Sequence, residues 1–432
     1  MFSVGSFFQH KLNRDISWTL GSFVILAVSG IVINLVVAGF RDAAALGVFN
    51  QSYAIYIITS QIAVFGIHYS VLRHAAFYEK NPEERGSLLF TSVVMSIFLG
   101  FLAAVILFFS SEKIGVILDS DITGRAIGYA AFGLLFFPLN KVLLSYLNGL
   151  RYMKAFSILQ ASRYVLVMLW VAIVATSDMD FALSTLGFFV AESSTVVLAV
   201  IYLIFKKECK ALKFNRRWVS RHFSFGAKGL LAGMFVEMNS RIDVLLIGFF
   251  LSDELVGIYS FAAMLVDGLY HVLAMVRINF NPVLVGCLRD YDWSSAQKLL
   301  RKSKILGYPA TLIMSILISV AFWVLTSLLI PEKGLASGIY PLTILLAGLT
   351  IISAYIPFDN LLMVSGRPGW QTFQHMTVVV SNVILNLSLV PIFGLAGAAL
   401  ATASSYIVGT LMLMFMVDRL LKWKLWNNQI TS

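Results

Sequence analysis

Charged side chains inside long apolar runs are the residues of this sequence best suited to chemistry. Five of them lie deep in such runs: Glu192, Glu237, Arg241, Asp243 and Asp267. A charge at the centre of a bilayer costs about 2.5 to 3.5 kcal/mol. If all five faced lipid, the cost would be roughly 12 to 17 kcal/mol, comparable to the stability of a whole protein. We therefore expect them to face one another or a polar cavity.

The spacing of these charges suggests pairs. Glu237 and Arg241 stand four residues apart, so on one helix they either neutralise each other or form a functional pair. Asp243 points about 200° away from Arg241 on such a helix and needs another partner, or water. Asp267 and His271 are also four apart, and this pair either carries a coupling proton or is a hydrogen-bonded structural contact. These acids, with Glu192, are our ion-coupling candidates.

A second set of polar residues lies within the apolar runs or at their ends: Lys141, Arg163, Arg277 and Asp359. Taken singly, each cation is explained by snorkelling to the lipid headgroups. If they converge from several helices, they form a site for an anionic group, because arginine grips phosphate oxygens in a bidentate fork.

The elements that carry these residues are apolar spans of membrane length. Of the 432 residues, 59% are hydrophobic and 12% charged, and about 20 apolar helical residues cross a bilayer. We predict an all-α integral membrane protein with about twelve transmembrane helices. The predicted spans are 17–40, 45–69, 88–109, 126–147, 158–176, 183–205, 229–250, 256–276, 305–330, 340–363, 373–392 and 396–416.

The charge of the loops predicts the orientation. With the spans alternating, 23 Lys and Arg residues fall on one side and four on the other, which by the positive-inside rule places both termini in the cytoplasm. The densest basic run, Lys206 to Arg221, is a topology determinant resting on anionic headgroups rather than a nucleic-acid site. Cys209 and Cys287 fall in cytoplasmic loops, so no structural disulfide is expected. The first span is expected to be an uncleaved anchor.

A weak internal repeat predicts two lobes. The segment Ile33–Phe40 aligns with Ile242–Phe249, and Pro138-Leu139-Asn140 aligns with Pro357-Phe358-Asp359. Each half holds six spans, so both enter the membrane in the same sense, and a pseudo-twofold axis along the membrane normal is expected. We predict an N-terminal six-helix lobe (1–205), a basic cytoplasmic linker (206–224) and a C-terminal six-helix lobe with a short tail (225–432), around a central cavity.

The sequence contains few motifs that are typical of enzymes. The sequence has no phosphate-binding G-x-x-x-x-G-K-[ST] loop, and its six histidines show no metal-ligand spacing. Asp119-Ser120-Asp121 has the D-x-D form of metal-dependent glycosyltransferases, but it lies in a short outer loop. We therefore expect no catalytic residue, no metal and no cofactor.

Three motifs resemble a known family. The segment Ser381 to Thr402 (SNVILNLSLVPIFGLAGAALAT) is similar to the eleventh-to-twelfth helix signature of Wzx-type polysaccharide flippases, the polysaccharide transporter family of the MATE-like MOP superfamily. Its Pro391 and Gly394 end one helix and turn tightly. Arg241 to Ser260 resembles the family's seventh-to-eighth helix pattern, and Phe65-Gly66-Ile67 with Ser70 and Arg73 resembles its second helix. The loop 41–45 departs from the usual Gly-Pro-like turn.

This resemblance implies a flippase that moves an undecaprenyl-diphosphate-linked oligosaccharide from the inner to the outer leaflet of the bacterial cytoplasmic membrane. The saccharide would serve O-antigen (lipopolysaccharide), capsule or exopolysaccharide synthesis. Expected partners are that lipid, membrane lipids, and a polymerase and chain-length regulator of the same pathway. We expect alternating access, with Arg163, Arg241, Lys141 and Arg277 as contacts to the diphosphate or to acidic sugars.

Two other functions stay open. A cation-coupled drug exporter of the same superfamily would use Glu192, Asp243 and Asp267 as its substrate site. A membrane polymerase or glycosyltransferase would need a large outer catalytic loop, and the longest outer segment, around 111–125, is too short for one.

Overall fold

The computed structural model describes residues 4–209, 211–239, 241–329, 331–427 and 429–430. The chain divides into two compact units, Met1–Met234 and Phe235–Ser432, and each is described by itself. Nearly every element is a helix, so the predicted fold class is confirmed.

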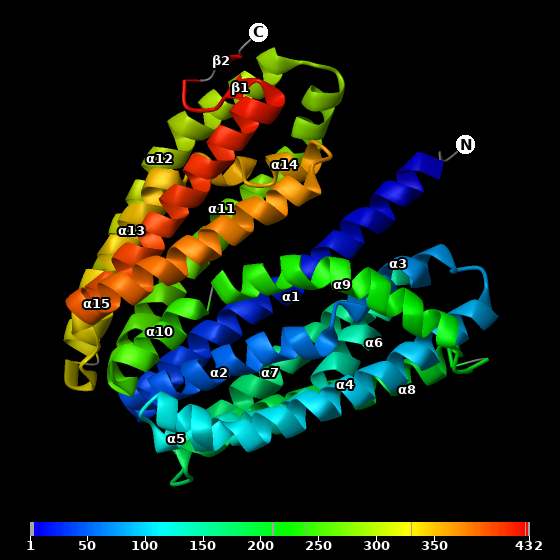
Figure 1. Ribbon diagram of the computed structural model, residues 1–432, viewed down its shortest axis with the longest axis horizontal. Coiled ribbons are helices and arrows are strands. Elements are labelled where there is room, and N and C mark those ends of the chain that lie inside the picture. The colour runs from blue at the N-terminus through cyan, green and yellow to red at the C-terminus, as the bar shows by residue number, and fades with distance from the viewer. Residues whose placement is uncertain (1–3, 210, 240, 330, 428, 431–432) are drawn as a thin grey trace. The chain divides into compact units, whose positions relative to one another are not determined.

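Unit 1 is a helical bundle in which α1 packs on α7, α4 on α5, and α7 on α8 (Figure 1). Its elements are α1 (Val4–Phe40), α2 (Ala43–Val64), α3 (Ile67–Phe77), α4 (Pro82–Ile117), α5 (Asp121–Leu134), α6 (Phe137–Gly149), α7 (Met153–Thr176), the 3-10 turn η1 (Phe181–Thr185), α8 (Leu186–Phe205) and most of α9 (Arg216–Asn239).

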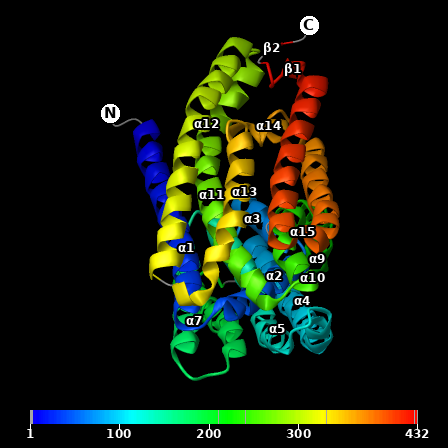
Figure 2. The ribbon, with the colours of Figure 1, turned by 90° about the vertical axis from the view of Figure 1, so that its left-hand side faces the viewer.

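Unit 2 is a second bundle in which α15 packs on both α10 and α13, and α11 and α12 also contact α13 (Figure 2). Its elements are α10 (Ile242–Phe250), α11 (Asp253–Arg289), α12 (Trp293–Val324), η2 (Leu325–Leu329), η3 (Pro331–Lys333), η4 (Leu335–Gly338), α13 (Ile339–Ile352), η5 (Ile356–Phe358), α14 (Leu361–Val364), α15 (Pro368–Leu421), β1 (Trp423–Lys424) and β2 (Gln429–Ile430). The two short strands pair antiparallel, with Trp423 opposite Ile430.

The number of spans differs from the twelve apolar runs of the sequence. Among the described residues, eight helices are long and apolar enough to cross a membrane, or ten when each of two bent helix pairs counts as one span. α15 contains two predicted spans, joined across a kink at Gly394 (φ 57°, ψ −133°). The predicted turn at Pro391–Gly394 is thus confirmed. Counting α15 twice gives eleven, and the remaining predicted span, 229–250, falls on the end of α9 and on α10.

Outward-facing apolar side chains suit these helices to lipid. Only about a third of the most apolar stretch of α4 is buried inside the protein, and still less of that of α12. Phe98, Phe101 and Phe109 on α4, and Leu317 on α12, are more than half exposed. Water would penalise so much apolar area, whereas a bilayer solvates it.

The bent pair α2 and α3 positions one part of unit 1. The axis turns by 50° at Phe65 and Gly66, whose φ angles are 47° and 67°. Glycine tolerates this left-handed conformation without a Cβ penalty. Gly66 also lies against Gly226 of α9, where an added Cβ would meet the Gly226 carbonyl oxygen at 2.6 Å. The backbone of α9 therefore lies directly against the α2–α3 bend.

The segment that joins the two predicted lobes is attached to unit 1. Glu208 is buried and accepts hydrogen bonds from Tyr152 at 2.8 Å and Tyr146 at 3.2 Å. It also forms an ion pair with Arg85 at 3.0 Å. Further on, Trp218 is 1% exposed, so Glu208 and Trp218 are both buried against the helices of unit 1.

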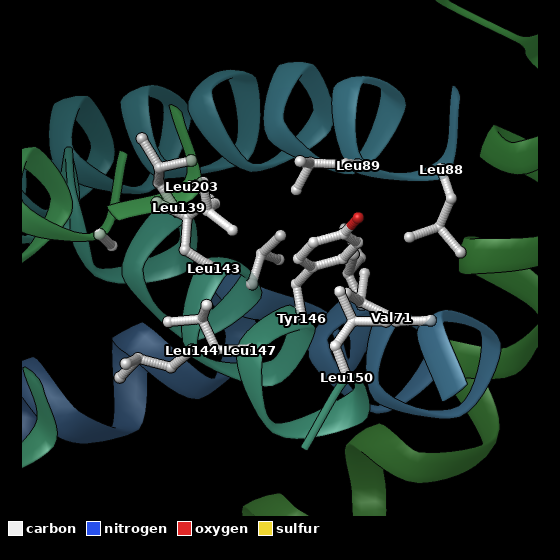
Figure 3. Packing of buried hydrophobic residues seen from close by; sticks show 14 of the residues in the cluster. Val71, Leu88, Leu89, Leu139, Leu143, Leu144, Tyr146, Leu147, Leu150 and Leu203 are labelled. Atoms are coloured by element: carbon white, nitrogen blue, oxygen red, sulfur yellow. The ribbon is translucent and has the colours of Figure 1, made fainter. Parts of the chain in front are cut away.

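An apolar cluster lies beneath these contacts. Figure 3 shows its leucines from α4 and α6 around the ring of Tyr146, with Val71 from α3 and Leu203 from α8. Trp218 belongs to the same cluster. Burying such side chains gains about 1.5 to 3 kcal/mol each, so this cluster stabilises the end of unit 1 where the linker docks.

Candidate functional site

The first charged cluster lies inside unit 1. Arg163 of α7 forms an ion pair with Glu192 of α8 at 3.2 Å, and their side chains are only 9% and 2% exposed. Glu192 also accepts hydrogen bonds from the Tyr56 hydroxyl at 3.4 Å and from the Asn140 amide. Helices α2, α6, α7 and α8 thus each supply one member. Such pairing is what makes a charge tolerable at this depth.

Lys141 lies close to this cluster. Its Nζ is 5.5 Å from the centre of the Phe137 ring, and the Arg163 guanidinium lies 5.4 Å from the same ring. Arg163 also covers the Tyr164 ring at 4.8 Å. Aromatic faces attract cations, most strongly away from water. Lys141 and Arg163, two of the predicted phosphate contacts, therefore lie near the same aromatic ring of unit 1.

The second cluster lies in unit 2 around Asp243 of α10, whose side chain is buried. Its Oδ2 accepts hydrogen bonds from Thr402 at 2.7 Å and from Tyr259 at 3.2 Å. Its Oδ1 accepts one from the Asn386 amide at 3.0 Å. Asn386 also donates to the side chain of Asn382. The partner that the sequence left open for Asp243 is thus a ring of neutral donors from α11 and α15.

Two polar atoms of this cluster have no hydrogen bond. Within the described part of the chain, the side-chain nitrogen of Asn382 and Oδ1 of Asn386 are both buried and find no partner. A buried acceptor without a partner costs about 1 to 3 kcal/mol. Together with the Asp243 carboxylate and the Thr402 hydroxyl, Oδ1 of Asn386 offers oxygen atoms of the kind that hard cations prefer.

The placing of Glu237 and Arg241 differs from the expectation of one continuous helix. Glu237 is near the end of α9, which stops at Asn239, and Arg241 precedes α10 with φ −125°. The predicted span 229–250 is therefore interrupted between them, and helical i, i+4 geometry does not apply. The break falls in the polar stretch Glu237 to Asp243, inside the predicted apolar span.

Asp267 and His271 lie on α11, which is continuous from Asp253 to Arg289 as their predicted spacing requires. Asp267 lies within electrostatic range of both Arg241 and His271. The structure thus brings three of the predicted deep polar residues together in unit 2.

Arg277, also on α11, is paired. Its Nη1 donates to Oδ2 of Asp359 at 2.9 Å, and both side chains are 22% exposed. Gln374 of α15 donates to the other carboxylate oxygen at 3.4 Å, and Gln371 to the Asp359 carbonyl at 2.9 Å. Of the four residues expected to gather, Lys141 and Arg163 lie in unit 1, and Arg277 and Asp359 lie in unit 2.

Several residues of these clusters were not singled out from the sequence: Tyr56, Tyr259, Asn382, Asn386 and Thr402. The sequence contained a signal for three of these residues. The last three belong to the segment Ser381–Thr402 that carried the family resemblance, and Asn140 belongs to the repeat that aligns it with Asp359. No comparable pattern marked the two tyrosines, since a hydroxyl among aromatic core residues looks like packing.

A family comparison decides the classification. Residues 12–278 match the model of a family described as polysaccharide biosynthesis protein. The chain belongs to this family. The resemblance found in the sequence is thereby confirmed, and the family is one of transporters rather than enzymes, as expected.

A curated relative agrees with this classification. The probable flippase AglR of Haloferax volcanii is 24% identical over 234 residues, which are 52% of this chain and 47% of AglR. The chain thus matches less than half of the length of its curated relatives.

Solved structures share the fold. The lipid II flippase MurJ in its inward closed conformation superposes with a TM-score of 0.72 at 15% identity, covering 93% of this chain and 87% of MurJ. An inward-facing multidrug resistance MATE family transporter of the MOP superfamily gives 0.75 at 11% identity, covering 92% and 96%. The predicted MATE-like fold is therefore confirmed.

Proposed function

We propose that this chain is a flippase for a lipid-linked oligosaccharide. The observation that carries the proposal is its membership of the polysaccharide biosynthesis family, on a fold it shares with the lipid II flippase MurJ. The finer proposal is an undecaprenyl-diphosphate carrier in a bacterial cytoplasmic membrane, with both termini cytoplasmic. The saccharide would serve O-antigen, capsule or exopolysaccharide synthesis, followed by a polymerase and a chain-length regulator.

The diphosphate of such a substrate needs cations within the membrane. We assign this role to Lys141 and Arg163 in unit 1, and to Arg241 and Arg277 in unit 2. The Arg163–Glu192 pair supports a switchable contact: the carboxylate holds the guanidinium until a phosphate replaces it. Arginine presents a planar fork to either group, so the exchange keeps its hydrogen-bond geometry.

Coupling to an ion would give the transport its direction. We assign the coupling site to Asp243, supported by its burial among hydroxyl and amide groups and by the unpartnered oxygen of Asn386. A proton or a sodium ion bound there would neutralise the carboxylate. The free energy of burying the Asp243 side chain would then depend on the ion gradient. Asp267, Glu237, Glu192 and His271 are the further candidates. Alternating access is the mechanism that links ion and substrate.

Depletion of the protein in its source organism tests the proposal. Mass spectrometry would measure the lipid-linked saccharides, and a membrane-impermeant probe would report their leaflet. Complete units trapped on the inner leaflet support the flippase. Units that accumulate on the outer leaflet indicate a polymerisation defect and contradict it.

A second function is favoured by one observation. A multidrug transporter shares the fold over 92% of this chain, and a cation exporter would use Glu192, Asp243 and Asp267 as its substrate site. The same depletion experiment separates the two, because an exporter leaves the lipid-linked saccharides unchanged.

A further inference from the structure

A pocket outside the two charged clusters lies in unit 1, between the end of α3 and the first half of α9. Its volume is about 450 Å³, within the range of small-ligand sites. It is lined by Arg73, His74, Phe77 and Tyr78 on one side and by Ser220, Arg221, Ser224 and Phe225 on the other. None of these residues belongs to the predicted transport site.

The charge of the pocket is positive. Arg73 and Arg221 contribute two guanidinium groups, and the described residues that line the pocket include no Asp or Glu. Within the part of the chain that the structure describes, neither arginine forms an ion pair with a carboxylate. The hydroxyls of Ser220 and Ser224 add neutral donors. This combination of donors suits an anion with several oxygen atoms.

Aromatic rings hold both arginines in place. The Arg73 guanidinium lies 5.4 Å from the centre of the Phe225 ring, and that of Arg221 lies 5.1 Å from the Trp218 ring. Arg221 also donates to the Tyr78 hydroxyl at 3.4 Å. A guanidinium stacked on a ring keeps its N–H edge free for another acceptor.

The walls of the pocket are fixed by buried contacts behind it. His222 is fully buried, and its Nδ1 lies 2.9 Å from the Ser70 hydroxyl of α3. Trp218 donates to Glu84 of α4 at 3.2 Å. On the next turn of α9, Gly226 touches the α2–α3 bend so closely that a Cβ would lie 2.1 Å from the Phe65 carbonyl oxygen. The spacing of the two arginines is therefore built into the fold.

We propose that this pocket binds a phosphate group. The carrier of that phosphate is either an anionic phospholipid headgroup or a phosphorylated solute. A lipid source is favoured by the exposed aromatic side chain of Phe77 in the pocket wall, which is 77% exposed, since such rings settle at the membrane interface. The bound phosphate bridges Arg73 on α3 to Arg221 on α9 and holds the first half of α9 on unit 1.

The test uses the purified full chain and two probes. Native mass spectrometry measures retention of phosphatidylglycerol against phosphatidylcholine, and calorimetry measures binding of inorganic phosphate. Arg73→Gln and Arg221→Gln are each expected to weaken the bound probe roughly tenfold, which corresponds to about 1.4 kcal/mol. The matched control is Arg217→Gln, an exposed arginine of the same helix outside the pocket.

A second variant keeps the test valid if an arginine substitution disturbs folding. Ser224→Trp fills the pocket without changing its charge, and it is expected to lower binding as much as the arginine variants do. Arginine-dependent retention of phosphatidylglycerol identifies a lipid headgroup. Arginine-dependent binding of inorganic phosphate without lipid selectivity identifies a solute. If neither probe responds to Arg73, Arg221 or Ser224, the proposal is wrong.

Discussion

At the scale of single residues, the two charged clusters compensate their buried charges in different ways. Arg163 and Glu192 compensate each other, whereas Asp243 is held by hydroxyl and amide donors. Removal of one partner of an ion pair leaves the other charge buried and uncompensated. A carboxylate among neutral donors can be neutralised while the side chain keeps its size and shape. The two clusters should therefore respond differently to substitution.

Removal of one partner from the unit 1 pair is expected to destabilise the protein strongly. Arg163→Gln or Glu192→Gln leaves a buried charge alone, at a cost of about 3 to 5 kcal/mol. The double variant should be less destabilised than the sum of the two single variants. Thermal unfolding of the purified protein in detergent measures all three. Additive losses would show that the pair is not coupled.

Neutralisation of Asp243 is expected to leave the fold intact and to abolish ion coupling. In Asp243→Asn the side-chain oxygen still accepts from Thr402 or Tyr259, so the melting temperature should change little. Transport by reconstituted protein should then no longer respond to a proton or sodium gradient. Glu254→Gln, an exposed acid at the start of α11, is the control. A gradient response that persists in Asp243→Asn would remove this residue from the coupling site.

At the scale of elements, the packing of α9 on the α2–α3 bend depends on two glycines. Gly226→Ala places a methyl group against the Phe65 carbonyl and must displace α9, so a loss of about 1 to 3 kcal/mol is expected. Gly286→Ala on α11 meets no atom within 4 Å and should be neutral or stabilising by up to about 1 kcal/mol. Denaturant unfolding compares the two variants. Equal effects would contradict the close approach.

The docking of α9 should also depend on pH. Burial, with a further contribution from His74, lowers the pKa of His222 to about 4, whereas an unfolded histidine titrates near pH 6.5. Between these values the unfolded chain binds more protons, so the contribution of His222 to stability is complete above about pH 6.5 and declines as pH falls toward 4. Hydrogen exchange of residues 216–226 should show faster exchange at pH 5 than at pH 7, after correction for the intrinsic rate. His222→Gln should remove most of this difference.

The sequence predicted the elements better than their breaks. The apolar runs located the membrane helices, and Pro391 with Gly394 located the kink in α15, because both signals are local. The interruption near Arg241 lies in the polar stretch Glu237 to Asp243, and the bend at Phe65 is followed by Gly66, but neither signal was used to divide the predicted spans. Among the site residues, Asp243 was recognised by its cost in a membrane. Its donors Asn386 and Thr402 follow more than 140 residues later, and only the fold brings them together.

At the scale of the whole molecule, two helical units each bury a charged cluster among membrane-length helices. The repeat in the sequence places equivalent residues in comparable contacts: Asn140 holds Glu192 in unit 1, and Asp359 holds Arg277 in unit 2. A transporter that moves a charged headgroup past apolar lipid needs such polar positions in both halves.

The most direct test of the flippase proposal is a reconstituted assay. Purified protein is placed in vesicles that contain a fluorescent polyprenyl-diphosphate-linked oligosaccharide, and a membrane-impermeant quencher reports the fraction in each leaflet. We predict that the protein accelerates movement between leaflets and that Lys141→Gln slows it, whereas the surface variant Arg217→Gln does not. Movement at the rate of protein-free vesicles, in the presence of folded protein and either ion gradient, would show that the chain is not a flippase for this lipid.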